Sequence, residues 1–275
     1  MTATLGEVVA ALEARYDPAL AESWDAVGLV CGDRAEPVQR VLFAVDPVTA
    51  VVDEALDGGA QLLVTHHPLL LTAVHGVPAD DPKGRLVHRL VRAGAALFVA
   101  HTNADRAADG GVNDALAAAL ELRDPVPLEP VAPGSRAGLG RVGRLERPVP
   151  LRHFADRVAA ALPATAGGVR VAGDPLRRVQ AVAVCGGSGG SLVAAAAAAG
   201  ADVLLTSDQK HHPVSEAGEA GGPALVDVAH WASEWPWLPV AAGALLRDLG
   251  GRVEVAVSRR VTDPWTATVM QAGGG

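Results

Sequence analysis

The stretch GAQLLVTHHP, residues 59–68, has a counterpart further along the chain in GADVLLTSD, residues 200–208. Each copy starts at a glycine, continues as a short apolar run and ends at polar residues. A short apolar run that follows a helix is typical of a strand buried on both faces of a largely parallel sheet. A strand–helix–strand unit that occurs twice is therefore the basis of the predicted fold.

The flanking segments repeat in the same order. An apolar strand and a helix precede each copy, and a second helix, a glycine and another strand follow it, leading to AHTNAD (residues 100–105) and AHWASE (229–234). Self-similarity of this kind indicates a repeated supersecondary unit. We therefore expect an α/β fold of two similar α/β units, with mostly parallel sheets flanked by helices.

A segment rich in proline and glycine, residues 123–143, indicates a domain boundary. The predicted first domain comprises residues 1–124 and 232–275 and carries the two adjacent histidines. The predicted second domain comprises residues 125–231.

Composition excludes several classes of protein. The 275 residues are 49% hydrophobic and 20% charged, which argues against wholesale disorder. The net charge of −8 argues against nonspecific nucleic-acid binding, and two cysteines cannot form a disulfide scaffold. The N-terminus lacks the features of a signal peptide, and no apolar run approaches the roughly 20 residues of a membrane helix. We expect a soluble cytoplasmic protein.

His66 and His67 end the first of these strands and precede Pro68. Open α/β sheets bind ligands at the carboxyl ends of their strands. Neighbouring residues of a regular strand point to opposite faces, so both histidines can serve one site only where the strand bends. Neutral imidazole is a good ligand for Zn, Fe, Mn, Co or Ni. The alternative is a partly exposed pair of histidines that binds nothing.

Two further pairs have the spacing of one helical turn. His101 and Asp105 are four residues apart, as are His230 and Glu234, so each pair shares a face if its segment is helical. With His66 and His67 they supply four imidazoles and two carboxylates. That number exceeds the four donors of one tetrahedral site and suits two divalent ions.

The glycine-rich stretch CGGSGGS, residues 185–191, joins a predicted strand to a helix. Backbone amides at such a junction can bind phosphate, which makes Gly186, Gly187, Ser188 and Gly189 candidate substrate contacts. The stretch lacks the Walker A lysine, and a tight structural turn is the alternative.

Seven short segments in order along the chain resemble one family. They are SWDAVGL (23–29), THHP (65–68), HTNAD (101–105), GVND (111–114), TSD (206–208), HWASE (230–234) and DPW (263–265). On these motifs the chain resembles the Nif-three-like proteins, whose members are often named GTP cyclohydrolase I type 2 homologues. It departs from the usual pattern at Ala26, Ser207 and His211, and none of these departures removes an expected ligand.

The resemblance implies a centre of two divalent metal ions. The family's ligands fall on His66, His67, Asp105, His230 and Glu234, whereas His101 matches a histidine placed beside the ligands. The resemblance also implies a homohexamer, for which the late tryptophans Trp231, Trp235, Trp237 and Trp265 are candidate interface anchors.

Two functions remain open. The first is a metal-dependent hydrolase that opens the ring of GTP to give formate and dihydroneopterin triphosphate, with Glu234 or His101 moving a proton. GTP or another phosphorylated small molecule would be its substrate. The second is a non-catalytic metal-binding or regulatory protein that acts through partner proteins.

Overall fold

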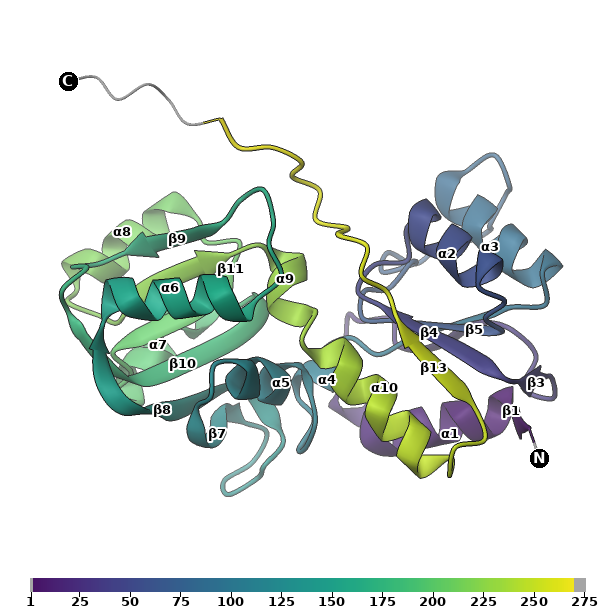
Figure 1. Ribbon diagram of the computed structural model, residues 1–275, viewed down its shortest axis with the longest axis horizontal. Helices are drawn as coiled ribbons and strands as arrows, with labels where there is room; N and C mark the ends of the chain where they lie inside the picture. The colour runs from purple at the N-terminus through teal and green to yellow at the C-terminus, as the bar shows by residue number, and fades with distance from the viewer. Residues whose placement is uncertain (1, 270–275) are drawn as a thin grey trace. The chain divides into compact units, whose positions relative to one another are not determined.

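The computed structural model describes residues 2–269 and divides into two compact units (Figure 1). Within the described residues, the first unit comprises 2–115, 131–138 and 237–262, and the second comprises 116–130, 139–236 and 263–269. These crossing points differ from the predicted 124/125 and 231/232, because one helix runs across the first boundary and the chain enters the second unit again after residue 262.

The first unit is built on a five-stranded sheet. Its order is β13 (Glu254–Val257), β4 (Arg40–Ala44), β5 (Leu62–Thr65), β6 (Ala96–Val99) and β2 (Gly28–Cys31). The strands from β13 to β6 are parallel, and β2 runs antiparallel to β6. A separate antiparallel pair joins β1 (Ala3–Thr4) to β3 (Pro37–Val38).

Helices cover both faces of this sheet. Helices α2 (Thr49–Asp57) and α3 (Pro82–Arg92) pack on the face that carries Leu42, Leu63 and Leu97 (Figure 1). Helices α1 (Leu5–Arg15) and α10 (Trp237–Asp248) cover the other face, and α1 begins at a capping box made by Thr4 and Glu7. The central strands β5 and β6 are fully buried along their length, as expected of strands that have helices on both faces.

Trp237 anchors α10 in the core of the first unit. It is fully buried, and its Nε1 donates a hydrogen bond to Oη of Tyr16 at 3.1 Å. Burial raises the pKa of Tyr16 to about 12, so the phenol stays neutral. Trp231 is also buried, so neither of these two tryptophans is exposed as an interface anchor, whereas Trp265 is exposed.

The second unit is built on a six-stranded mixed sheet. Its order is β7 (Arg123–Pro130), β8 (Gly138–Pro150), β10 (Arg178–Ser188), β11 (Val203–Ser207), β12 (Ala224–Val228) and β9 (Val169–Ala172). Strands β10, β11 and β12 are parallel, while β8 and β9 are antiparallel to their neighbours. The expected boundary segment 123–143 thus forms strand β7 and the start of β8.

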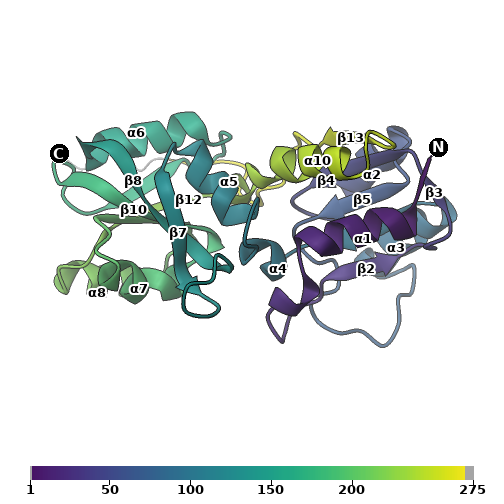
Figure 2. The ribbon, with the colours of Figure 1, turned by 90° about the horizontal axis from the view of Figure 1, so that it is seen from below.

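Two helical layers enclose the second sheet (Figure 2). The end of α5 (Val112–Ala119) and α6 (Leu151–Ala161) pack on one face, around Phe154 and Val182. Helices α7 (Val193–Ala198) and α8 (His211–Glu219) pack on the other, around Ala183 and Leu204.

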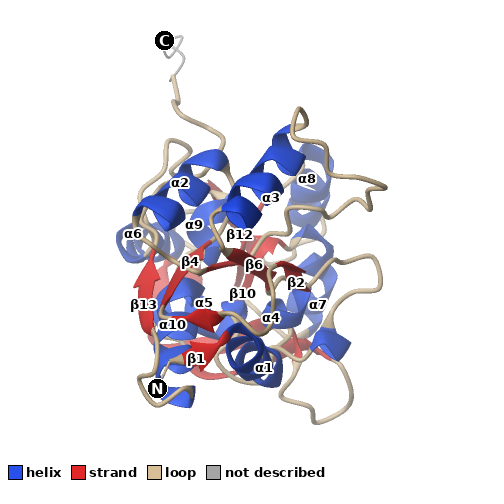
Figure 3. Cartoon of the chain, turned by 90° about the vertical axis from the view of Figure 1, so that its right-hand side faces the viewer, coloured by secondary structure: helices blue, strands red, loops and turns tan. Residues whose placement is uncertain are grey.

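The predicted α/β fold of two similar units is confirmed. The order β4, α2, β5, α3, β6 in the first unit repeats as β10, α7, β11, α8, β12 in the second, with strands between helical layers (Figure 3). Each copy then leads into a short helix, α4 (Thr102–Asp105) or α9 (His230–Glu234). Within residues 2–269, no helix is both long and apolar enough to cross a membrane.

Candidate metal centre

Three histidines of the first unit meet at the carboxyl ends of adjacent parallel strands. His66 and His67 follow β5, and His101 follows β6 as the N-cap of α4. One ring nitrogen from each lies within 4.8 Å of the others. The strand ends at Thr65, so the adjacent imidazoles are no longer held on opposite faces, and their ring centroids are 5.1 Å apart.

Asp105 adds a carboxylate to this group. Helix α4 carries it one turn beyond His101, and its Oδ1 lies 3.7 Å from Nε2 of His66. Both side chains are buried, with His66 fully enclosed. Nδ2 of Asn113 donates to the backbone carbonyl of Asp105 at 3.0 Å and so fixes the end of this short helix.

The hydrogen bonds at Nδ1 define the tautomer of all three histidines. Nδ1 of His66 lies 2.9 Å from the carbonyl of Ala100, and Nδ1 of His101 lies 2.9 Å from Oδ1 of Asp25. Nδ1 of His67 lies 2.7 Å from Oδ1 of Asp46. Carbonyl and carboxylate oxygens only accept, so each Nδ1 carries a hydrogen, and a ring in its neutral form then presents its lone pair at Nε2. Metal-binding histidines are held in this way.

Asp25 is ionised in this arrangement. Burial by itself would raise its pKa, but hydrogen bonds from His101 and Thr102 outweigh burial and hold the pKa of Asp25 well below its usual range. From the sequence, Asp25 is recognisable only as part of the motif SWDAVGL, without a role, and Asp46 is not identified as a partner of His67. The signal for Asp46 is its position directly after an apolar strand, at the same sheet edge as His66 and His67.

The second unit repeats the arrangement with fewer groups. Nε2 of His230 lies 2.9 Å from Oε1 of Glu234, one turn along α9, and Glu234 is almost fully buried. Nδ1 of His230 lies 2.7 Å from Oδ2 of Asp208, so carboxylate oxygens face both ring nitrogens of His230, and a metal ion at Nε2 would leave the ring hydrogen on Nδ1. Asp208 has a φ of 56°, an uncommon conformation for a residue other than glycine that is often found at functional sites.

The glycine-rich stretch packs against this pair. Gly186, Gly187 and Ser188 lie at the end of β10 instead of in a loop. The amide of Gly187 donates to Oγ of Ser233 at 2.8 Å, and the amide of Gly189 donates to Oγ1 of Thr206 at 2.7 Å. Both amides therefore have acceptors inside the chain, which favours the structural turn over the phosphate-binding hypothesis.

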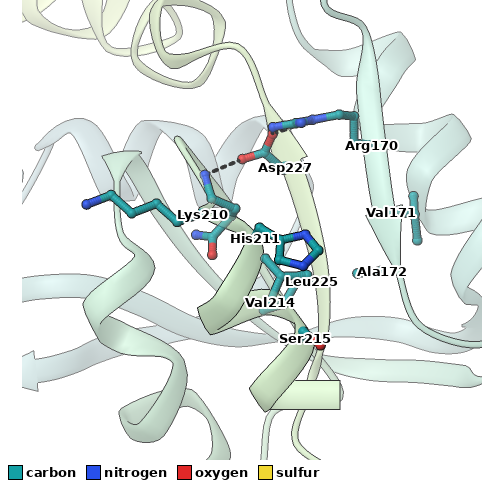
Figure 4. A pocket seen from close by; sticks show the side chains of 10 residues that line it. Arg170, Val171, Ala172, Lys210, His211, Val214, Ser215, Leu225 and Asp227 are labelled. Atoms are coloured by element: carbon teal, nitrogen blue, oxygen red, sulfur yellow. Dashed lines mark hydrogen bonds and ion pairs between the residues drawn. The ribbon is translucent and has the colours of Figure 1, made fainter. Parts of the chain in front are cut away.

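Asp227 in β12 joins a polar residue of β9 to one that follows β11. One carboxylate oxygen accepts from Nε of Arg170 at 2.9 Å, and the other accepts from the amide of Gln209 at 2.9 Å (Figure 4). These residues border a cavity of about 390 Å³ whose lining also includes Lys210 and His211. His211, one of the departures from the family pattern, thus lines a cavity that contains none of the predicted metal ligands.

The donor set of the first unit fits a divalent transition metal. Three neutral imidazoles and one carboxylate are the ligands that Zn²⁺ and its neighbours prefer, and oxygen acceptors hold the imidazoles in the required tautomer. His101 belongs to this group by position as fully as His66 and His67 do.

We expect Asp46→Ala to weaken Zn²⁺ binding about 10–100-fold, because His67 would lose the acceptor that orients its ring. Isothermal titration calorimetry on the metal-free protein measures this change. Asp53→Ala is the matched control, since Asp53 pairs with Arg89 on the surface and touches no histidine. Equal Zn²⁺ affinity in the Asp46 variant and the wild type would contradict the assigned role.

Comparison with known proteins places the chain in one family. Residues 3–264 match the model of the family described as Duf34/NIF3 (NGG1p interacting factor 3). A Streptomyces coelicolor protein named GTP cyclohydrolase 1 type 2 homolog is 54% identical over 274 residues, which cover 98% of this chain and 95% of that protein.

Two other comparisons agree. A Mycobacterium tuberculosis protein of the same name is 39% identical over an alignment of 371 residues that covers 96% of this chain and 97% of that protein, so it has segments without a counterpart here. The crystal structure of a Staphylococcus aureus hypothetical protein superposes with a TM-score of 0.88 at 26% identity, covering 98% of this chain and all of the other. This chain is a member of the Duf34/NIF3 family.

Proposed function

We propose that this protein is a metal-dependent hydrolase that holds two divalent ions and acts on GTP. The proposed ligands are His66, His67 and Asp105 in the first unit and His230 and Glu234 in the second, and His101 is either a further ligand or a proton carrier beside them. One observation carries the proposal: each of the four histidines has its Nδ1 against an oxygen that can only accept a hydrogen bond. Such pairing orients imidazoles for metal binding, whereas a surface histidine without a ligand does not require it.

The buried carboxylates complement this ligand set. Asp105 is 9% exposed and Glu234 is 2% exposed, and an ionised carboxylate is costly to bury without a cation or a hydrogen-bonding partner. Each lies close to an imidazole Nε2, at 3.7 Å for Asp105 and 2.9 Å for Glu234. A divalent ion between the imidazole and the carboxylate would balance the buried negative charge.

The chemistry that such ions supply is activation of water for attack at neutral pH. The chain's own residues would bind the substrate next to them and move protons. Glu234 and His101 are the proposed proton carriers. His101 can accept a proton only where its Nε2 is not bound to metal, because its Nδ1 already carries a hydrogen. The name shared by the relatives suggests GTP as the substrate. The reaction proposed for it is ring opening with release of formate.

The test is formate release from GTP. Protein purified without metal and loaded with Zn²⁺, Fe²⁺, Mn²⁺, Co²⁺ or Ni²⁺ is incubated with GTP, and formate and the pteridine product are measured. We expect release with at least one metal and none after chelation. Protein that binds two ions per chain and releases no formate with any of them would contradict the hydrolase proposal, and the non-catalytic metal-binding function would then be favoured.

A further inference from the structure

A second cavity, of about 510 Å³, lies in the second unit beside His230. Its size falls in the range of ligand-binding pockets in proteins, roughly 300–1,000 Å³. Its walls come from the carboxyl ends of β11 and β12, from the loop before β9 and from the segment that follows Thr262. One of the proposed metal ligands is thus part of the wall of a cavity large enough for a nucleoside.

Trp265 lines this cavity and is 74% exposed. Trp24, at 58%, is also exposed, whereas Trp231 and Trp237 are buried. An indole ring along a cavity offers a flat apolar face, and flat heteroaromatic rings stack on such faces.

The segment that carries Trp265 is held in place at two points. Asp263 is buried, with 8% of its surface exposed, two residues before the indole. Oγ1 of Thr268 donates to the carbonyl of Ala166 at 2.6 Å, which joins the segment to the loop before β9. The indole is therefore presented by a fixed wall of the cavity.

The charges of the lining distinguish a base from a phosphate. Asp208, Asp227 and Asp263 contribute three carboxylates, and Arg170 contributes one guanidinium that is already bonded to Asp227. Apart from a metal ion at His230, a phosphate in this cavity would meet three carboxylates and one paired guanidinium. A ring edge with N–H donors meets carboxylate oxygens, each of which can accept more than one hydrogen bond. Guanine presents two adjacent donors, N1–H and the 2-amino group, and adenine has an acceptor at N1.

We propose that this cavity binds the guanine base of the substrate, stacked on Trp265. That the ligand is a nucleotide rests on the proposed function. That its base is guanine and lies in this cavity rests on Trp265 and the acidic lining. The phosphates then lie outside this cavity.

The test uses guanosine, which has no phosphate, and Zn²⁺-loaded protein in a calorimetric titration. We expect guanosine to bind more tightly than adenosine, and Trp265→Ala to weaken guanosine binding at least about tenfold. Trp265→Phe should retain most of the affinity because it keeps an aromatic face. Leu176→Ala, which removes a 60% exposed apolar side chain of the same unit outside the cavity, should leave the affinity unchanged.

Equal guanosine affinity in the wild type and Trp265→Ala would overturn the proposal, as would binding of inorganic triphosphate without binding of guanosine. Guanosine binding that depends on Trp265 together with no formate release from GTP would support this proposal and contradict the hydrolase function. Formate release with a KM for GTP unaltered by Trp265→Ala would support the hydrolase function and overturn this proposal.

Discussion

Glu234→Gln is expected to lower Zn²⁺ affinity by more than about 100-fold while the metal-free protein stays folded. Loss of a residue that merely orients a ligand costs about 10–100-fold, and we assign Glu234 to the metal itself. The amide keeps the size of the side chain but removes a buried negative charge next to His230. Without metal that removal relieves a desolvation penalty, so the melting temperature of the metal-free variant should equal or exceed that of the wild type.

A metal ligand should lose metal affinity on substitution while the metal-free protein keeps or gains stability. A structural residue should lose stability with or without metal. Asp105→Asn should behave in the same way in the first unit. Glu216→Gln on the exposed surface of α8 is the chemical control and should alter neither quantity. If Glu234→Gln bound Zn²⁺ as the wild type does, Glu234 would not be a ligand. The same titration on His101→Ala tests whether His101 binds metal or stands beside the ligands.

Gly187→Ala is expected to abolish measurable Zn²⁺ binding at the His230–Glu234 pair. A Cβ at this position would lie 2.5 Å from Oε1 of Glu234 and 3.0 Å from Nε2 of His230, closer than atoms in contact can approach. The carboxylate and the imidazole would both have to move, and their ligand atoms could not keep the positions that they hold now. Zn²⁺ stoichiometry per chain, measured after dialysis, should fall relative to the wild type.

Gly200→Ala is the control that distinguishes the clash of a Cβ with Glu234 and His230 from strain in the backbone. Gly187 and Gly200 have almost the same φ, 67° and 70°, but a Cβ at Gly200 meets nothing within 4 Å. Both variants should lose roughly 1–2 kcal/mol of folding free energy from the left-handed backbone conformation. Only Gly187→Ala should lose metal. Loss of metal in both variants would mean that strain in the second unit, and not the close approach of Gly187, controls the site.

The sequence could predict the strands and the positions at which they end. Apolar runs such as residues 62–65 and 203–205 are local signals, and the polar residues that follow them mark the carboxyl edge of a parallel sheet. That edge is where histidines and carboxylates gather, so local spacing alone could single out His66, His67, His101, Asp105, His230 and Glu234. The two adjacent histidines at residues 66–67 also predicted the bend that lets them share a site.

Mixed pairing in the second sheet could not be predicted in the same way. Residues 123–143 are rich in proline and glycine, which indicated a domain boundary, yet they contribute β7 and the start of the long strand β8. Residues of β8 pair with residues of β10 that lie 28 to 43 positions further along the chain, as in the pairing of Val142 with Ala183. Pairing at that separation depends on which strand edge is available after the parallel strands have formed.

By itself, then, the sequence determined the repeated α/β unit and the ligand types at its strand ends, because both depend on neighbours within a few residues. Only the tertiary structure decided how those ligands are held. Asp25 reaches His101 across 76 residues, Asp46 reaches His67 across 21, and Asp208 reaches His230 across 22. It also decided that Gly187 lies against Glu234. Contacts of this kind arise when separate strand ends are brought to one edge of a sheet, and no local pattern encodes the distance between them.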